Sequence, residues 1–81
     1  MKTIYKYTIT RKTVQMPVDA VIVHVDLQDQ GYCIWALVDD SNPLESRQFD
    51  VIGTGWEYEP NMHYVGTILE NAFVWHIVEI K

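Results

Sequence analysis

The chain has 81 residues, of which 48% are hydrophobic, and its 11 acidic and six basic residues give a net charge of −5 at pH 7. A chain of this length folds as one domain, residues 1–81. Four of the six bases lie within the first 12 residues, and the acidic remainder of the chain repels phosphate groups. We therefore expect no nucleic-acid partner. No apolar run approaches the length of a membrane span, and a single cysteine, Cys33, rules out an intrachain disulfide. We therefore expect a cytoplasmic protein without a membrane partner.

Short runs rich in Val, Ile, Thr, Tyr and Trp, bounded by Gly, Pro, Asn and Asp, follow one another along the whole chain. No segment has the apolar period of a helix. We expect strands at about 2–10, 20–28, 32–38, 46–52, 62–69 and 72–80, with a short extended piece near 13–16. The fold class is therefore predicted to be all-β, a small antiparallel sheet folded into a compact barrel or sandwich of about six strands.

The first long hairpin, residues 20–39, is predicted with two possible registers. A type I turn over residues 28–31, with Gly31 in the left-handed region as a G1 bulge, is preferred. A two-residue turn at Asp29-Gln30 would instead place Val21, Val23, Val25 and Leu27 opposite Val38, Ala36, Ile34 and Tyr32. Because "YCIWALV" is apolar on both faces, its alternation does not choose between them.

The C-terminal run predicts a second hairpin with a two-residue turn at Glu70-Asn71. This register pairs Gly66 with Trp75, where the absent side chain leaves room for the indole. One face then holds only core-like residues: Tyr64, Gly66, Ile68, Phe73, Trp75 and Ile77. The other face is also mostly apolar, so its own chain or another subunit covers it. With the high apolar content, this predicts a homo-oligomer or a foreign protein partner.

Gly53-Thr54-Gly55, directly after the strand at 46–52, raises the question of a phosphate cradle. Such a cradle needs amide groups at a helix N-terminus or beside a lysine. The segment is followed instead by "WEYEP", whose acids repel an anion. The favoured interpretation is a structural turn or bulge, with ligand contact as the alternative.

Trp56 and Tyr58 follow these glycines in an acidic loop. Trp and Tyr anchor many protein interfaces, and loops on a β scaffold often bind partners. The alternative is that both side chains fold back over the sheet as a lid. The candidate binding residues are therefore Trp56, Tyr58, Gly53, Thr54 and Gly55.

The histidines are the candidates for a metal site. In the hairpin register above, His63 and His76 share one face as diagonal neighbours. Zinc needs at least a third ligand, and nothing in the sequence supplies one nearby. No metal site and no cofactor are predicted, and His63 and His76 remain only as candidates.

The single cysteine is the candidate for nucleophilic catalysis. His24 and Asp26 lie on the strand beside Cys33, but a carboxylate next to a thiol raises the thiol pKa. Cys33 is therefore interpreted as a small buried hydrophobe. We expect no catalytic residues and no enzymatic activity.

The segments "MKTIYKY", "MPVDAVIVHVDLQ", "IWALVD", "VIGTG" and "YVGTILENAFVWHIVE" follow one another along nearly the whole chain. This succession resembles a group of small uncharacterised phage and prophage proteins. The matching positions are mainly turn and core residues: Pro17, Trp35, Ala36, Gly53, Gly66, Trp75 and His76. The resemblance implies no catalytic residues, and it implies an accessory protein made in the cytoplasm of an infected bacterium.

These observations predict a non-enzymatic phage accessory protein that binds a host or defence protein stoichiometrically through its aromatic and acidic loop. The first alternative is a protein that binds or sequesters a small ligand such as a nucleotide. The second alternative is a structural or assembly protein of the virion.

Overall fold

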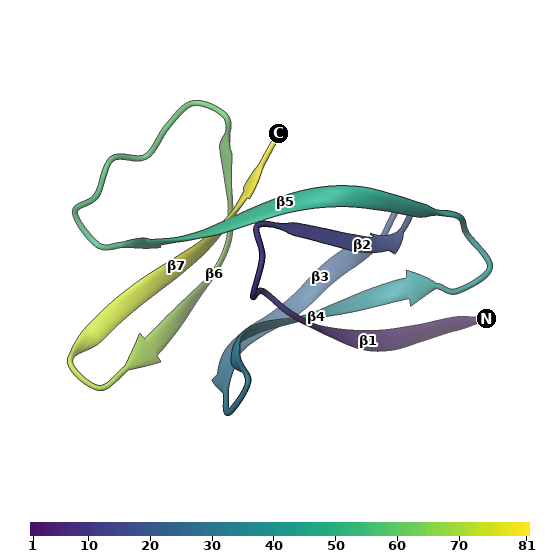
Figure 1. The fold of residues 1–81 in the computed structure, drawn as a ribbon, viewed down its shortest axis with the longest axis horizontal. Helices are drawn as coiled ribbons and strands as arrows, with labels where there is room; N and C mark the ends of the chain where they lie inside the picture. Colours follow the sequence, from purple (N-terminus) through teal and green to yellow (C-terminus); the bar gives the residue numbers. More distant parts are fainter.

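The computed structural model describes residues 1–81 as seven antiparallel strands (Figure 1). The strands are β1 (Lys2–Thr8), β2 (Thr13–Pro17), β3 (Val21–Gln28), β4 (Gly31–Asp39), β5 (Leu44–Gly53), β6 (Met62–Glu70) and β7 (Phe73–Ile80). The all-β prediction is confirmed, and the extended piece near 13–16 is a complete strand. The chain contains no helix that is long and apolar enough to cross a membrane.

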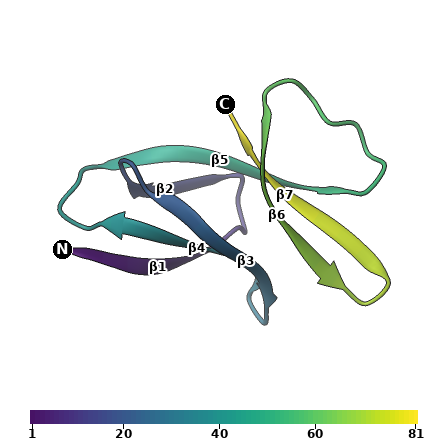
Figure 2. The ribbon, with the colours of Figure 1, turned by 180° about the vertical axis from the view of Figure 1, so that it is seen from behind.

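The strands form two sheets, with the orders β1-β4-β3 and β2-β5-β7-β6. No hydrogen-bonded ladder joins the two sheets, so the molecule is the sandwich and not the barrel of the two predicted forms. β3 packs against β6, and β2 packs against β4. Figures 1 and 2 show the three-stranded sheet at one end of the molecule and the β6–β7 hairpin at the other, with β5 running along both.

The core lies between the sheets and combines residues from both of them. The three-stranded sheet contributes Ile34, Ala36 and Val38, all at most 2% exposed. The four-stranded sheet and the connection before β3 contribute Val14, Met16, Ala20, Phe49, Ile68 and Ile77. These side chains alternate along their strands with residues on the outer faces, because successive side chains of a strand point to opposite sides.

The two sheets approach each other most closely where β3 packs against β6. A Cβ atom added to Gly66 would overlap the Cγ2 methyl group of Val25. Gly66 therefore allows the two sheets to come into contact at this point, because only a residue without a side chain permits such a close approach.

The turn of the β3–β4 hairpin is the two-residue turn and not the preferred bulged turn. Gln28 pairs with Gly31, so Asp29-Gln30 form the turn, and Gly31 has a φ of +119°. The pairs that the two-residue register predicts next to the turn are present: Leu27 with Tyr32 and Val25 with Ile34.

A β-bulge lies further along the same hairpin, at Val23. The extra residue shifts the pairing by one, so that Val21 lies opposite Leu37 and not Val38. The sequence alternation carries no signal for this bulge, because residues on both of its sides are apolar.

The register predicted for the β6–β7 hairpin is wrong. Glu70 pairs with Phe73, so the turn is Asn71-Ala72. Asn71 has a φ of +54°, a left-handed conformation that Asn tolerates better than most residues. The shifted register places Ile68 opposite Trp75, and Gly66 opposite Ile77.

A second bulge, at Val65, changes which face the start of β6 presents. Tyr64, predicted on the core-like face, pairs with Val78 on the outer face and is 56% exposed. His63 pairs with Glu79, whereas His76 pairs with Thr67. The two histidines therefore lie on opposite faces of the sheet, and the prediction that they are diagonal neighbours is wrong.

Candidate functional site

The segment Gly53-Thr54-Gly55 forms a tight turn at the end of β5. The amide of Trp56 donates a hydrogen bond to the carbonyl oxygen of Gly53 at 3.1 Å. Gly55 has a φ of +90°, as the third residue of a type II turn requires. The Trp56 amide is therefore engaged within the turn and is not free to bind a phosphate.

The indole of Trp56 lies directly on the backbone of Gly53. A Cβ atom on Gly53 would come within 2.9 Å of Trp56 Cε2 and Nε1. The Trp56 ring also meets Trp75 edge to face, with ring centroids 5.8 Å apart and planes at 81°. Trp56 is nevertheless 60% exposed. Trp56 therefore folds back on the sheet, as one of the two interpretations predicts, and it still exposes most of its surface.

Trp75, against which Trp56 packs, is fixed by a ring contact and by a hydrogen bond. Its ring stacks on Phe73 at a centroid distance of 5.9 Å and an angle of 23°. Its Nε1–H donates to Glu70 Oε1 at 3.0 Å, and the Tyr32 hydroxyl donates to the same oxygen at 3.0 Å. Burial and this hydrogen bond raise the pKa of the Tyr32 phenol. Glu70 thus ties the β3–β4 hairpin to the β6–β7 hairpin beneath the aromatic rings.

The far end of the loop between β5 and β6 is fixed by a second turn. The amide of Met62 donates to the carbonyl oxygen of Glu59 at 3.0 Å, with Pro60 inside this turn. The amide of Lys81 donates to the carbonyl oxygen of Asn61 at 2.9 Å. The loop is therefore anchored at both ends, which limits the conformations open to its aromatic residues.

The loop and the sheet line a cavity of about 230 Å³ that is open to solvent. All five candidate binding residues of the sequence line it, together with Ile52, Tyr64 and His76. Trp56, Tyr58 and Tyr64 are 60%, 52% and 56% exposed, so three aromatic side chains converge on one solvent-accessible cavity.

His76 positions Tyr64 and the Gly53–Gly55 turn through hydrogen bonds. Its Nε2 lies 2.8 Å from Thr54 Oγ1, and its Nδ1 lies 3.2 Å from the Tyr64 hydroxyl. The Tyr64 hydroxyl also forms a short hydrogen bond with Thr67 Oγ1. Both ring nitrogens of His76 are therefore engaged. Sequence reasoning missed Tyr64, since only the bulge at Val65 places this side chain at the cavity.

A second open cavity, of about 400 Å³, shares Gly53, Thr54 and Trp56 with the first. Its lining includes Ala72, Phe73, Val74 and Trp75 of the hairpin. Phe73 is 61% exposed and Val74 is 38% exposed. We call the residues that line the two cavities around Trp56 the aromatic site.

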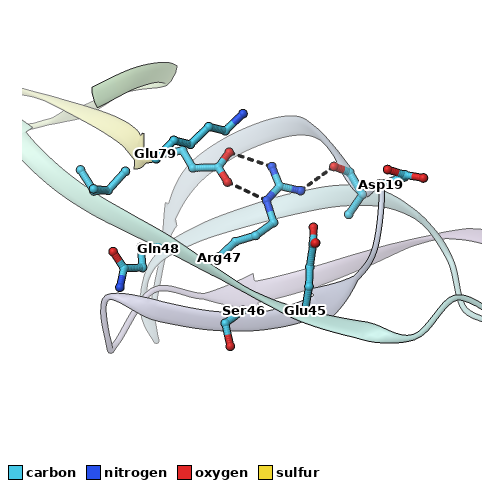
Figure 3. Close-up of a pocket in the computed structure, with 9 residues that line it drawn as sticks. Asp19, Glu45, Ser46, Arg47, Gln48 and Glu79 are labelled. Carbon is cyan, nitrogen blue, oxygen red and sulfur yellow. Dashed lines mark hydrogen bonds and ion pairs between the residues drawn. The ribbon is translucent and has the colours of Figure 1, made fainter. Parts of the chain in front are cut away.

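The largest cavity, about 540 Å³, lies elsewhere, beside the ion pair between Arg47 and Glu79 (Figure 3). Arg47 donates from Nε and Nη2 to the two Glu79 carboxylate oxygens at 2.7 and 2.8 Å, and from Nη1 to the Ala20 carbonyl at 2.6 Å. The side chains of the pair are only 16% and 9% exposed. Their hydrogen bonds lower the pKa of Glu79 and raise that of Arg47.

This ion pair links β5 to β7 and, through the Ala20 carbonyl, to the connection before β3, and it leaves Arg47 few donors for a ligand. The guanidinium is engaged in three directions, and the acids Asp19 and Glu45 also line the cavity. Sequence reasoning missed the pair. The alternation of inward-facing and outward-facing residues along each strand could have revealed it. Arg47 stands two residues before the core residue Phe49, and Glu79 stands two residues after Ile77, so both should face inward.

The residues considered for nucleophilic catalysis do not form an accessible site. Cys33 is fully buried, and its Sγ lies 3.7 Å from Thr8 Oγ1. Asp26 lies opposite Cys33, as the sequence indicates. The ring of His24 packs on that of Trp35, with the two ring centroids 5.4 Å apart. The structure contains no group of three or more His, Cys, Asp or Glu side chains placed to hold a metal ion.

Fold and site together define a small β sandwich that presents an aromatic surface at one end. The chain matches the family model described as "Domain of unknown function (DUF7352)" over residues 1–81, and it belongs to this family. No curated protein and no solved structure matches the chain.

Proposed function

We propose that this protein acts by stoichiometric binding of another protein at the aromatic site, and not by catalysis. The observation that carries the proposal is the convergence of Trp56, Tyr58 and Tyr64, each more than half exposed, on one cavity. Trp and Tyr dominate the binding energy of many interfaces, because they bury a large area with few rotatable bonds.

The site is also organised before it meets a partner. Turns fix both ends of the loop, Trp56 rests on Gly53, and His76 holds Tyr64 through its hydroxyl. Binding therefore immobilises few additional side chains, and the entropy lost on association is correspondingly small.

The sequence resemblance to phage and prophage proteins guides the choice of partner. In that setting the partner is a host or defence protein in the cytoplasm of an infected bacterium, and binding at the aromatic site blocks its action. A blocking protein needs surface complementarity alone, which is what the aromatic site offers.

Quantitative co-purification from a bacterial lysate tests this proposal. We expect wild-type protein to enrich one partner that the Trp56→Ala, Tyr58→Ala double variant loses. A Leu44→Ala variant, altered at an exposed leucine outside the site, serves as the matched control and retains the partner. The purified components should then form a complex of fixed stoichiometry. Equal recovery by the double variant, with its fold intact, would contradict the proposal.

A small ligand such as a nucleotide is the second candidate for the same site, because aromatic rings beside a Gly-Thr-Gly turn can stack on a base. The smaller cavity of the site, about 230 Å³, lies below the roughly 300–1,000 Å³ of most ligand pockets, whereas the larger one, about 400 Å³, lies within this range. A phosphate would also meet the carboxylates of Glu57 and Glu59. A thermal-shift panel of nucleotides distinguishes the two, since protein binding alone predicts no stabilisation by any of them.

We further propose that the outer face of the three-stranded sheet meets a second copy of the chain. Ile4, Leu37 and Val21 lie in one row across the three strands and are 57%, 41% and 57% exposed. The next rows along this face carry Lys6 on β1 and Asp26 on β3. A two-fold axis parallel to β4 would lay β1 of one copy over β3 of the other. Ile4 would then meet Val21, and Lys6 would approach Asp26.

A further inference from the structure

Three of the eight residues that line the smaller cavity are Trp or Tyr. Trp56 and Tyr58 come from the loop, Tyr64 comes from β6, and all three expose more than half of their surface. The ring face of Trp or Tyr is the negative end of its quadrupole, so several such rings around one space attract a positive charge.

The part of the chain between Arg47 and Lys81, which contains the site, is acidic in sequence. No Lys or Arg occurs between Arg47 and Lys81, whereas five acids do: Asp50, Glu57, Glu59, Glu70 and Glu79. Glu79 is paired with Arg47, and Asp50 lies 3.6 Å from Lys12. Glu57 and Glu59 form no ion pair in the structure, and they flank Tyr58 in the sequence.

We infer that the aromatic site takes a lysine or arginine side chain of the partner protein between the rings of Trp56, Tyr58 and Tyr64. This inference rests on the proposed function, and it names the chemistry that the site recognises. The cavity is open to solvent, so a long side chain can enter it while its own backbone stays outside. Glu57 and Glu59 do not line the cavity, but they belong to the same loop, and their negative charges favour a cation bound nearby.

Titration with blocked amino acids tests this chemistry without knowledge of the partner. The probes are N-acetyl-lysine amide and N-acetyl-arginine amide, and N-acetyl-norleucine amide is the uncharged control. Binding is followed by the NMR signals of the Trp56 indole N–H and the Tyr64 ring. We expect the cationic probes to bind about two- to fivefold more tightly than norleucine, the ratio that a cation–π contact at an exposed site supports.

Two kinds of variant assign the binding to this site. Tyr58→Leu should abolish the preference for the charged probes, because it removes one ring and keeps an apolar side chain. Glu57→Gln combined with Glu59→Gln should weaken binding of the charged probes only, and should reduce its dependence on salt. Tyr5→Leu, at a half-exposed tyrosine of the other sheet, is the matched control and should bind as the wild type does.

The remaining outcomes separate this inference from the proposed function. Equal binding of norleucine and lysine amides would overturn the cation inference. No binding of any probe, together with a partner that still depends on Trp56, would overturn the inference and leave the proposed function intact. Tighter binding of tetramethylammonium than of either side-chain probe would assign the site to a free small cation, and would also overturn it.

Discussion

At the scale of single residues, the contact between Gly66 and Val25 carries the most specific prediction. A methyl group at position 66 has no space, because it would overlap Val25 Cγ2 between the two sheets. We expect Gly66→Ala to lower the free energy of unfolding by about 1–3 kcal/mol, the usual cost of overpacking. Chemical denaturation measures this change, and an unchanged midpoint would contradict the close approach of β3 and β6.

Gly53→Ala is the informative comparison, because its neighbour is a partly exposed ring and not a residue between the sheets. The added methyl group would come within 2.9 Å of the Trp56 indole, which can move outward into solvent. We therefore expect Gly53→Ala to lower stability less than Gly66→Ala does. It should shift the Trp56 indole N–H signal strongly and weaken partner binding.

The ion pair of Arg47 and Glu79 predicts a dependence of stability on pH. The hydrogen bond from Arg47 lowers the pKa of Glu79 in the folded protein below its ordinary value of 4.5. The pair therefore contributes its full stability above that pH, and the contribution is lost as the pH falls through the lowered pKa. When the pH is lowered from about 6 to about 3, the range in which carboxylates titrate, the free energy of unfolding should fall less for Glu79→Gln than for the wild type.

The same variant should be less stable than the wild type at neutral pH, by about 3 kcal/mol, the lower end for breaking a buried ion pair. Glu45→Gln is the matched control, because Glu45 lines the same cavity but is exposed and makes no hydrogen bond to Arg47. It should follow the wild type at every pH. Parallel pH profiles of Glu79→Gln and the wild type would show that the pair does not stabilise the fold.

At the scale of elements, the turn between β6 and β7 depends on the left-handed conformation of Asn71. A β-branched residue disfavours that conformation, so Asn71→Val should lower the free energy of unfolding by about 1–2 kcal/mol. Asn71→Gly should leave stability close to that of the wild type. Thermal denaturation of both variants checks this prediction, and equal losses would place the turn elsewhere.

The existence of the strands and of the two hairpins could be predicted from the sequence. The registers of the hairpins could not, nor could the pairing of β1 with β4, β2 with β5 and β5 with β7. Alternation and turn residues place every strand to within about two residues, as is typical for strongly patterned segments. The registers of the two hairpins could not be predicted in this way. The segment "YCIWALV" is apolar on both faces, and Glu70, Asn71 and Ala72 all suit a turn. The bulges at Val23 and Val65 then decide which side chains face outward.

The aromatic site shows the same limit. Trp56 and Tyr58 could be singled out from the sequence, since large aromatic residues in a short acidic loop are informative on their own. Tyr64 could not, because its place depends on the bulge at Val65. The support from Gly53 and Trp75 also depends on the pairing of β5 with β7, which joins residues far apart in the chain.

At the scale of the whole molecule, the exposed row of Ile4, Leu37 and Val21 on the outer face of the three-stranded sheet predicts self-association. Leu37→Glu places a charge in the middle of the exposed row and should shift the protein toward the monomer. Leu44→Glu is the matched control, since Leu44 is 66% exposed but lies on the other sheet. Sedimentation velocity over a range of concentrations measures both. A wild-type protein that stays monomeric throughout would contradict the proposed contact between copies.

The strand order also determines how the native state is reached. Only the β3–β4 and β6–β7 hairpins join neighbours in the chain, whereas the other three ladders join residues more than twenty positions apart. Closing such long loops before their contacts form is slow, so we expect the hairpins to assemble before β5 docks. Trp56 reaches Trp75 only when β5 has docked. We therefore expect the aromatic site to be complete only after β5, β6 and β7 have all assembled, so that a partly folded chain lacks it.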